Sequence, residues 1–350
     1  MGARGLFRPR KLSITADHSA PRFLTNAHPP PVGTHLPSSL RCSRNEIACP
    51  FFSSRGVIQE MCETVLVTGV GGPAGRAGAA YFASKGYRVV GTDLREVSSP
   101  ATDFRLVPAA RDPRFAAVLC AIALQEKATL VVSTVTEELP VVARMRPALR
   151  EREIALSISD PPGVDVANDK LRTAEDLDRA GVAVPATYAD ATPHDELAEA
   201  LGFPLLSKPR FGRGGRGVFV HRGADDLARA SPEEVVWQEF LPGEEYDLNL
   251  FVERDGAVPA AVLLRKTGLK NGLVGNALGV ERVELPDVAE LGIRAVRSLG
   301  LEGPIDMDIR LDSEGSPAVL EVNARLGANV LSAREVLDAL DEAWRNGRCA

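Results

Sequence analysis

Leu320-Glu321-Val322-Asn323-Ala324-Arg325-Leu326-Gly327 alternates apolar and polar side chains, which is the pattern of a half-buried β-strand. On such a strand Glu321, Asn323 and Arg325 lie on one face, and the apolar side chains that begin with Leu320 lie on the other. Carboxylate and amide oxygens beside a guanidinium suit Mg²⁺ that holds a phosphate chain. Asp308, thirteen residues before Glu321, adds a further carboxylate. Taken alone, the stretch is equally compatible with an edge strand whose polar face is solvated.

The composition is typical of a globular protein with two or three domains, because 45% of the 350 residues are hydrophobic and 25% are charged. A net charge of −6 gives no reason to expect nucleic acid or an anionic membrane as a partner. No apolar run approaches the roughly 20 residues that a membrane span needs. The five cysteines are scattered and form no CxxC motif, so we expect free thiols and a cytoplasmic location.

Residues 1–60 differ from the rest of the chain. They hold eight Lys and Arg residues against three acidic ones, together with Pro and Ser runs and no sustained periodicity. This pattern predicts a disordered leader. It fits either a transit peptide or an over-extended start that precedes a natural start at Met61, and we favour the second.

From Thr64 onward, strands alternate with helices, which predicts a parallel sheet covered on both faces. The expected strands are residues 65–67, 88–93 and 130–133, and the expected helices are residues 77–85 and 115–125. Turn-forming residues at 159–163 predict a domain boundary. We therefore expect one domain over residues 61–160 and a second over residues 161–350.

A glycine-rich turn follows the first strand of this domain. Its sequence, Thr68-Gly-Val-Gly-Gly-Pro-Ala-Gly75, resembles a dinucleotide-binding fingerprint, and Asp93 lies near the distance expected for a ribose-binding acid. A lone fingerprint is weak support, because many parallel α/β domains need glycines at this tight turn. An NAD(P)-dependent oxidoreductase or epimerase that uses Gly69–Gly75 is therefore an alternative function.

The second half has a different pattern. Helices are expected at residues 170–180 and 285–299, and strands at residues 203–209, 235–240, 247–253 and 258–265. Residues 305–311 and 318–323 are predicted to form an antiparallel pair across the turn at 312–316, which brings Asp308 beside the opening stretch.

Lys208 is expected to leave a buried strand and to be followed by a loop rich in glycine. The loop glycines are Gly212, Gly214, Gly215 and Gly217. Backbone N–H groups in such a loop can approach phosphate oxygens closely, while the lysine supplies charge. The sequence is not a GxxxxGK[ST] phosphate-binding loop, and a flexible basic hairpin is the alternative interpretation.

A third motif runs from Gln238 to Asp247. Glu239, Phe240 and Leu241 lie at the end of a predicted strand, and Glu245 follows a Leu-Pro-Gly turn. An exposed backbone stretch flanked by carboxylates suits an adenine edge and ribose hydroxyls. Taken alone, the segment is better explained as an acidic turn.

Taken together, the order of these motifs resembles the ATP-grasp superfamily. The order is Asn168-Asp169-Lys170, then Lys208 with its glycine loop, then Glu239 to Glu245, then Asp308 and the opening stretch. The similarity is strongest to the carbamoyl-phosphate-synthetase-like and carboxylate–amine ligase branches, and it covers about residues 64–335. It implies an α/β and α+β architecture: a Rossmann-like domain without NAD, followed by a two-lobed ATP-grasp fold. That would explain the first glycine motif without a nicotinamide.

The resemblance also implies roles for individual residues. The phosphate-binding set is Lys170, Lys208, Gly212, Gly214, Gly215 and Gly217, and the nucleoside-binding set is Glu239, Phe240, Leu241 and Glu245. The metal-binding set is Asp308, Glu321 and Asn323. The catalytic set is Arg325, which would steady the transferred phosphate, with Lys208 and, less firmly placed, Arg265.

The implied enzyme is an ATP-dependent carboxylate–amine ligase that uses two Mg²⁺ ions, with Mn²⁺ as an alternative. It would activate a small-molecule carboxylate as an acyl phosphate, which an amine then attacks. A hydrogencarbonate-phosphorylating, carbamoyl-phosphate-synthetase-like activity is a second possibility. The partners would be small molecules rather than nucleic acid or membrane, and a homodimer is compatible with the sequence.

Overall fold

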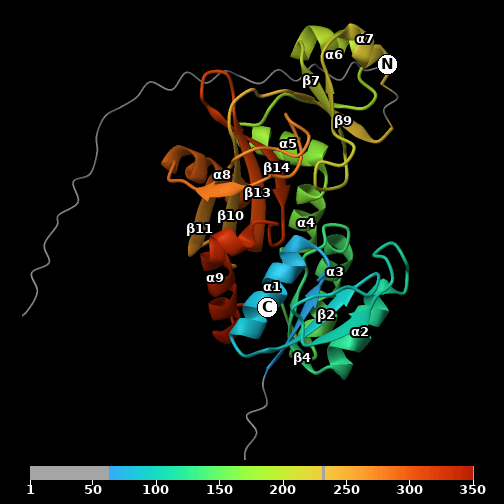
Figure 1. The fold of residues 1–350 in the computed structure, drawn as a ribbon, viewed down its shortest axis with the longest axis vertical. Coiled ribbons are helices and arrows are strands. Elements are labelled where there is room, and N and C mark those ends of the chain that lie inside the picture. Colours follow the sequence, from blue (N-terminus) through green and yellow to red (C-terminus); the bar gives the residue numbers. More distant parts are fainter. Residues whose placement is uncertain (1–62, 231–232, 350) are drawn as a thin grey trace, which may run out of the picture. The chain divides into compact units, whose positions relative to one another are not determined.

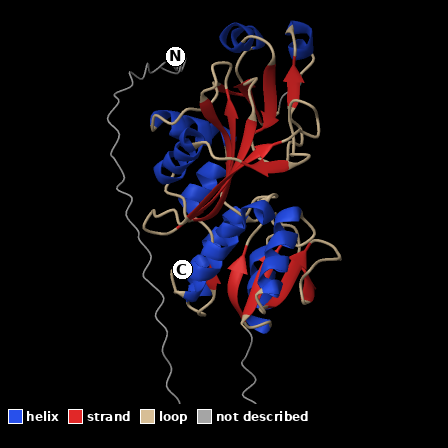
Figure 2. Ribbon diagram, turned by 60° about the vertical axis from the view of Figure 1, so that its left-hand side comes forward, coloured by secondary structure: helices blue, strands red, loops and turns tan. Residues whose placement is uncertain are grey.

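The computed structural model describes residues 63–230 and 233–349, so the predicted leader lies outside the described part. Within that part the strands form three sheets, which Figures 1 and 2 show from two directions. None of the described helices has both the length and the apolar character that crossing a bilayer requires.

The N-terminal sheet is parallel, as the alternation of strands and helices predicts, and its strand order is β3-β2-β1-β4-β5. The strands are β1 (Thr64–Thr68), β2 (Arg88–Asp93), β3 (Asp103–Leu106), β4 (Ala128–Val132) and β5 (Ala155–Leu156). Every residue of β1 is buried, because helices cover both faces. Leu66 packs with α2 (Phe115–Gln125) and α3 (Leu139–Arg150), whereas Val65 packs with α1 (Pro73–Ser84) on the opposite face.

Gly75 has a steric role in the turn between β1 and α1. A Cβ atom on Gly75 would lie 2.2 Å from the carbonyl oxygen of Gly69, and backbone cannot move away cheaply. The corresponding distance for Gly72 is 3.4 Å, which is an ordinary contact. Close backbone packing therefore accounts for a glycine at position 75 without any bound nucleotide.

Gly75→Ala is expected to destabilise the protein by about 1–3 kcal/mol, as overpacking does at rigid sites. Gly72→Ala is the matched control and should change the free energy of unfolding by less than about 1 kcal/mol. Urea denaturation of the two variants measures the difference. Equal stabilities would show that the turn relaxes around the added methyl group.

The smallest sheet is antiparallel, with strand order β6-β9-β7-β8. Its strands are β6 (Thr187–Ala189), β7 (Leu205–Pro209), β8 (Phe219–His221) and β9 (Val235–Glu239). Helices α6 (His194–Leu201) and α7 (Ala224–Ala228) accompany it, and Leu197, Leu205, Leu227 and Trp237 form its core. Strand β7 contains Lys208 and leads into the glycine-rich loop, so this sheet positions both the lysine and the start of the loop.

The third sheet is also antiparallel, with strand order β12-β11-β10-β13-β14. Its strands are β10 (Glu245–Val252), β11 (Ala260–Lys266), β12 (Val280–Arg282), β13 (Gly303–Leu311) and β14 (Pro317–Asn323). The last two form the predicted antiparallel pair. Leu248 and Met307 lie in the core with α8 (Pro286–Ser298), while the alternate residues Asp247 and Asp308 lie on the other face. The period of two thus gives this sheet one apolar face and one polar face.

A bulge in β14 corrects one expectation from the opening stretch. Asp308 pairs with Glu321, but the next residue, Ile309, pairs with Val319, so Leu320 is an extra residue. A bulge turns the local chain, and Leu320 lines the same cleft as Glu321 instead of the opposite face. Val322 does lie in the core, as predicted.

The predicted turn at 159–163 is wrong in part, because α4 (Pro161–Ala167) begins there with proline in its first turn. Helix α5 (Lys170–Arg179) follows, and its N-cap Asp169 accepts hydrogen bonds from the backbone of Leu171 and Arg172. The remaining elements are the 3₁₀ helix η1 (Val330–Ala333) and α9 (Arg334–Arg345).

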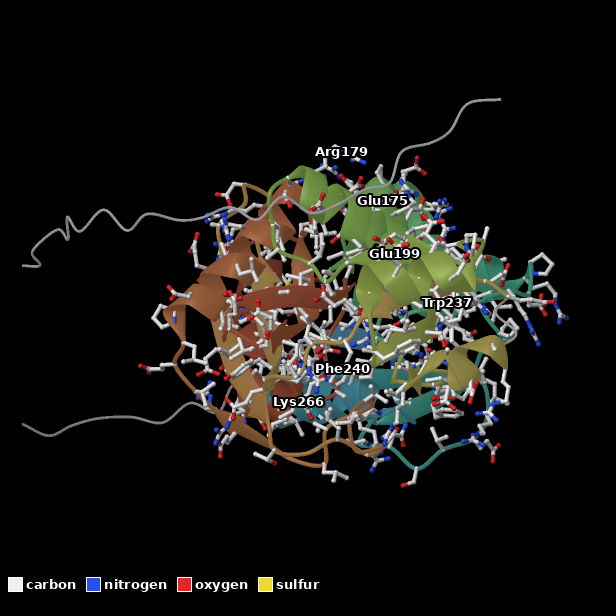
Figure 3. The ribbon with its side chains drawn as sticks, turned by 90° about the horizontal axis from the view of Figure 1, so that it is seen from above. Glu175, Arg179, Glu199, Trp237, Phe240 and Lys266 are labelled. Atoms are coloured by element: carbon white, nitrogen blue, oxygen red, sulfur yellow. The ribbon has the colours of Figure 1, made fainter. Side chains whose placement is uncertain are left out.

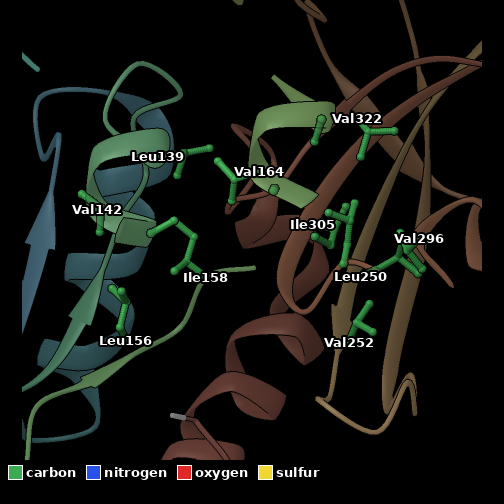
Figure 4. Packing of buried hydrophobic residues seen from close by; sticks show 14 of the residues in the cluster. Leu139, Val142, Leu156, Ile158, Val164, Leu250, Val252, Val296, Ile305 and Val322 are labelled. Atoms are coloured by element: carbon green, nitrogen blue, oxygen red, sulfur yellow. The ribbon is translucent and has the colours of Figure 1, made fainter. Parts of the chain in front are cut away.

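Hydrophobic clusters connect the parallel sheet with the large antiparallel sheet inside residues 62–350, which form one compact unit. Figure 4 shows one cluster, in which Leu139 and Val164 share a core with Ile305 and Val322. A second cluster joins α1 to α9. The division into domains at residue 160 stays a prediction.

Candidate functional site

A cleft of about 1090 Å³ collects side chains from all three sheets. The large antiparallel sheet contributes its polar face, and the small sheet contributes Lys208 and the glycine-rich loop. The parallel sheet contributes the glycine turn after β1 and the segment after β4. Most of the residues that the sequence singles out therefore share one cavity.

The wall of the cleft carries the predicted metal-binding set. Asp308 and Glu321 are direct neighbours across β13 and β14, and Asn323 pairs in register with Asp306. The Asn323 amide donates a hydrogen bond to Asp306 Oδ2 at 3.3 Å. Because their side chains project from the same face, the oxygen atoms of this set all face the cleft.

Two lysines approach Glu321 from the other elements. Lys170 Nζ lies 3.5 Å from Glu321 Oε2 and donates to the carbonyl of Gly212 at 2.8 Å. Lys208 is buried, and burial lowers its pKa to about 8 against the opposing influence of Glu321. Although burial acts in the other direction, the two ammonium groups hold the pKa of Glu321 below its usual value. The predicted phosphate contacts therefore surround a charged carboxylate.

Lys266, the residue that follows Arg265, lies in the cleft. Its ammonium donates to Glu245 Oε1 at 2.6 Å and to Asp308 Oδ1 at 2.7 Å, and Figure 3 labels it. Only 7% of its side chain is exposed. Burial alone would lower its pKa, but the two carboxylates raise the pKa of Lys266 above its usual value. Lys266 thus joins the predicted ribose-binding acid to a predicted metal ligand.

Arg265, by contrast, does not line the cleft, which corrects the expectation that it is catalytic. Neighbouring residues of a strand point to opposite faces, and Arg265 pairs at the surface with Glu244 and Glu281. The family resemblance that pointed to Arg265 did not determine which face of the strand this side chain lies on.

The structure does not bring Glu239, Phe240 and Leu241 to the lining of the cleft. Glu239 accepts a hydrogen bond from the backbone of Ala186 at 3.2 Å, and Leu241 is buried. The Phe240 ring lies 4.9 Å from the guanidinium of Arg310, which itself lines the cleft. The nucleoside-binding role of these three side chains stays a prediction.

A buried polar cluster beside the predicted metal ligands was not predicted from the sequence. Burial and the neighbouring carboxylates Asp306 and Asp308 raise the pKa of Asp247 well above its usual value. Asn249 and Asn329 both donate to Asp247 at 2.7 Å. The cluster does have a pattern in the sequence, because Asp247-x-Asn249 and Asp306-x-Asp308 place polar residues at alternate positions of two strands that pair.

Arg325 is buried and held from three sides. Its Nη1 donates to Asp306 Oδ2 at 3.1 Å and to the carbonyl of Leu326 at 2.7 Å. Its Nε donates to Thr136 Oγ1 at 3.1 Å, in the segment that follows β4. The guanidinium is therefore fixed on the cleft wall before any substrate binds.

The glycine-rich loop is positioned by close backbone contact and by one ion pair. Gly215 has φ +67°, and a Cβ atom there would lie 2.6 Å from the Cα atom of Gly275, so only glycine fits. Arg213 Nε lies 2.8 Å from Glu137 Oε2. Gly212 and Gly214 line the cleft, but Gly217 packs against Pro209 outside the lining.

The wall fits Mg²⁺ by the chemistry of its donors. Asp308, Glu321 and Asn323 offer only oxygen ligands that suit a hard cation. Burial and the carboxylates around it raise the pKa of Asp308, although Lys266 opposes this, so a divalent cation would relieve the crowding. No group of three or more His, Cys, Asp or Glu in the described ranges forms a complete metal cage. Magnesium sites completed by phosphate oxygens and water have this character.

The first glycine motif lines the same cleft from the parallel sheet. Asp93 accepts hydrogen bonds from the backbone N–H of Gly71 at 2.9 Å and of Leu94 at 2.8 Å. One carboxylate oxygen thus serves the glycine turn, and the other serves the backbone directly after β2. The geometry gives Asp93 a structural role that needs no dinucleotide.

Comparison with known proteins identifies the middle and C-terminal parts of the chain. Residues 167–329 match the family described as an ATP-grasp domain. A carbamoyl phosphate synthase arginine-specific large chain from Neurospora crassa is 29% identical over 224 residues, which cover 57% of this chain and 19% of that protein. A D-alanine–D-alanine ligase from Gloeobacter violaceus is 30% identical over 190 residues, which cover 48% of this chain and 62% of the ligase.

The fold is also that of solved ATP-binding enzymes. A biotin carboxylase from Campylobacter jejuni matches with a TM-score of 0.65 at 16% identity, covering 82% of this chain and 71% of that one. The chain spans less than two thirds of the length of the carbamoyl phosphate synthase and of the D-alanine–D-alanine ligase described above. The mixed parallel and antiparallel architecture predicted from the sequence is confirmed.

Proposed function

We propose that this chain, in which residues 167–329 form an ATP-grasp domain, is an ATP-dependent carboxylate–amine ligase. The observation that carries the proposal is the pairing of Asp308 with Glu321 in one cleft with Lys170, Lys208 and Arg325. This arrangement supports binding of a metal–phosphate complex. The similarity to a D-alanine–D-alanine ligase supports ligation of a carboxylate to an amine.

In the proposed reaction, the carboxylate of one substrate attacks the γ-phosphate of ATP and gives an acyl phosphate and ADP. Asp308, Glu321 and Asn323 would hold two Mg²⁺ ions, whose charge would offset the negative charge of the phosphate groups. Lys208 and Arg325 add positive charge around the transferring group. An amine then displaces phosphate and forms an amide bond. The loop at residues 212–217 would exclude water, because acyl phosphates hydrolyse easily.

The similarity to carbamoyl phosphate synthases supports a second candidate, in which hydrogencarbonate is the carboxylate. The two candidates share the phosphorylation step and differ in the acceptor of the phosphoryl group. A cytoplasmic location and a homodimer stay predictions from the sequence.

The test is an ADP-release assay with Mg-ATP and a panel of carboxylic acids that includes hydrogencarbonate. Each acid is assayed alone, with amines, and with hydroxylamine, which converts an acyl phosphate into a stable hydroxamate. We expect ADP release that depends on one class of acid, together with hydroxamate. Thermal stabilisation by NADPH but not by Mg-ATP would contradict the proposal and favour the oxidoreductase alternative.

A further inference from the structure

The segment at residues 133–138, between β4 and α3, brings the parallel sheet to the proposed reaction centre. Thr136 Oγ1 accepts the hydrogen bond from Arg325, and Glu137 forms the ion pair with Arg213 of the glycine-rich loop. The segment therefore contacts both the arginine proposed to steady the phosphate and the loop proposed to cover it. No role was predicted for this segment from the sequence.

Glu138 is the one acidic residue of this segment without an ion-pair partner among the described residues. The residue lines the cleft but is only 4% exposed, and its Oε2 atom has no hydrogen-bond partner among the described residues. The guanidinium of Arg213 is near, but it is paired with Glu137. A buried carboxylate oxygen without a donor is costly, so such an atom in a binding cleft points to a ligand that supplies the donor.

We propose that Glu138 binds the ammonium group of the amine substrate and accepts its proton. The inference rests on the ligase function proposed above and adds a substrate class, a primary amine that is cationic in solution. An ammonium group supplies both the missing donor and the missing charge. A single buried carboxylate offers too few ligands for a metal ion, and a neutral hydroxyl would leave the charge uncompensated.

The proton balance of the second step requires such a group. An ammonium nitrogen has no free electron pair, so one N–H bond must break, with its electron pair left on nitrogen, before the acyl phosphate is attacked. The proton goes to Glu138 Oε2. The nitrogen then forms the C–N bond, the C–O bond to phosphate breaks, and the second proton leaves with the phosphate.

The electrostatics of the cleft are compatible with this role. Burial raises the pKa of Glu138 to about 7, and Asp93 and Glu137 act in the same direction. A hydrogen bond from Thr68 and the charge of Arg213 oppose the shift. A carboxylate with a pKa near 7 is a far better proton acceptor than an exposed one and is still available at neutral pH.

The binding test uses L-alaninamide, a small cationic amine without a carboxylate, and its neutral analogue propionamide. Both are titrated calorimetrically into the Mg-ADP-loaded protein. We expect the wild type to bind L-alaninamide and not propionamide, and Glu138→Gln to bind it at least about tenfold more weakly. The control Glu151→Gln, at an exposed position far from the cleft lining, should bind like the wild type. Equal affinity in Glu138→Gln, or no binding by the wild type, overturns the proposal.

Two further measurements separate a ligand-binding role from a structural one. Thermal unfolding of Glu138→Gln should occur at a higher temperature than that of the wild type, because the change removes an unpaired buried charge. With each proteinogenic amino acid as the carboxylate, ADP release trapped by hydroxylamine should persist in Glu138→Gln, since hydroxylamine is largely uncharged at neutral pH. Release that depends on a protonated amine should fall. If no acid releases ADP even from the wild type, the ligase function fails, whereas the L-alaninamide titration still decides the role of Glu138.

Discussion

Glu321→Ala is expected to abolish carboxylate-dependent ADP formation, with a loss of about three orders of magnitude or more. Glu321 is the proposed metal ligand nearest to both phosphate-binding lysines, and metal stabilisation of a transferring phosphoryl group is worth several kcal/mol. The assay is ADP release under saturating Mg-ATP. Circular dichroism before the assay shows whether the variant is folded.

Glu314→Ala is the matched control for this variant. Glu314 lies in the exposed turn that joins β13 to β14, so the change removes a carboxylate of the same type a few residues from the site. It should leave ADP formation unchanged. Full activity in a folded Glu321→Ala protein would contradict the metal-site assignment, and the milder Glu321→Gln separates loss of charge from loss of volume.

Lys266→Met is expected to have the largest effect on stability, a loss of about 3–5 kcal/mol. The substitution keeps the length of the side chain but removes the ammonium that pairs with Glu245 and Asp308. Asp308 would then lose the buried cation beside it, while Glu245 would keep only Arg310. The folded-state pKa of Asp308, which Lys266 lowers, would rise further above that of the unfolded chain. Chemical denaturation at neutral pH measures the loss.

The raised pKa of Asp308 determines how the loss of stability in Lys266→Met depends on pH. A carboxyl group whose pKa is higher in the folded state destabilises the fold once the pH rises above its unfolded value. The deficit of Lys266→Met should therefore shrink as the pH is lowered toward that value. Arg265→Met is the control on the adjacent, exposed position and should leave the free energy of unfolding nearly unchanged. Similar losses in both variants would contradict the distinction between the two faces of β11.

The sequence predicted well those parts of the site that depend on local periodicity. Alternation placed Glu321 and Asn323 on one face of the strand, and the short turn before them brought Asp308 alongside. Arg325 also lines the cleft, but it does so from the bend after β14, which ends at Asn323, and not from the strand as predicted. The loop after Lys208 could be identified because only glycine tolerates its backbone conformations. These features need information from only a few neighbouring residues.

The remaining features depend on which face of a strand is turned toward the site or on contacts between distant segments. Lys266 lines the cleft and its neighbour Arg265 does not, and the basic residues at the end of β11 carry no signal for this difference. The bulge at Leu320 has no separate signal in a stretch that alternates regularly. Glu138 lies in a segment whose Thr136 contacts Arg325, 189 residues further along the chain. The periodicity of a single segment cannot show such a contact.

Helix α9 has a consequence for how the protein unfolds and for how it can be recombined. The Trp344 ring lies 6.5 Å from that of Phe82 in α1, and the same cluster contains Leu264 of β11. Because α9 packs in a cluster that contains residues of both large sheets, loss of this helix would uncover apolar surface on both of them. We expect a single calorimetric transition, and a chimera that exchanges the parallel sheet would need to carry α9 with it.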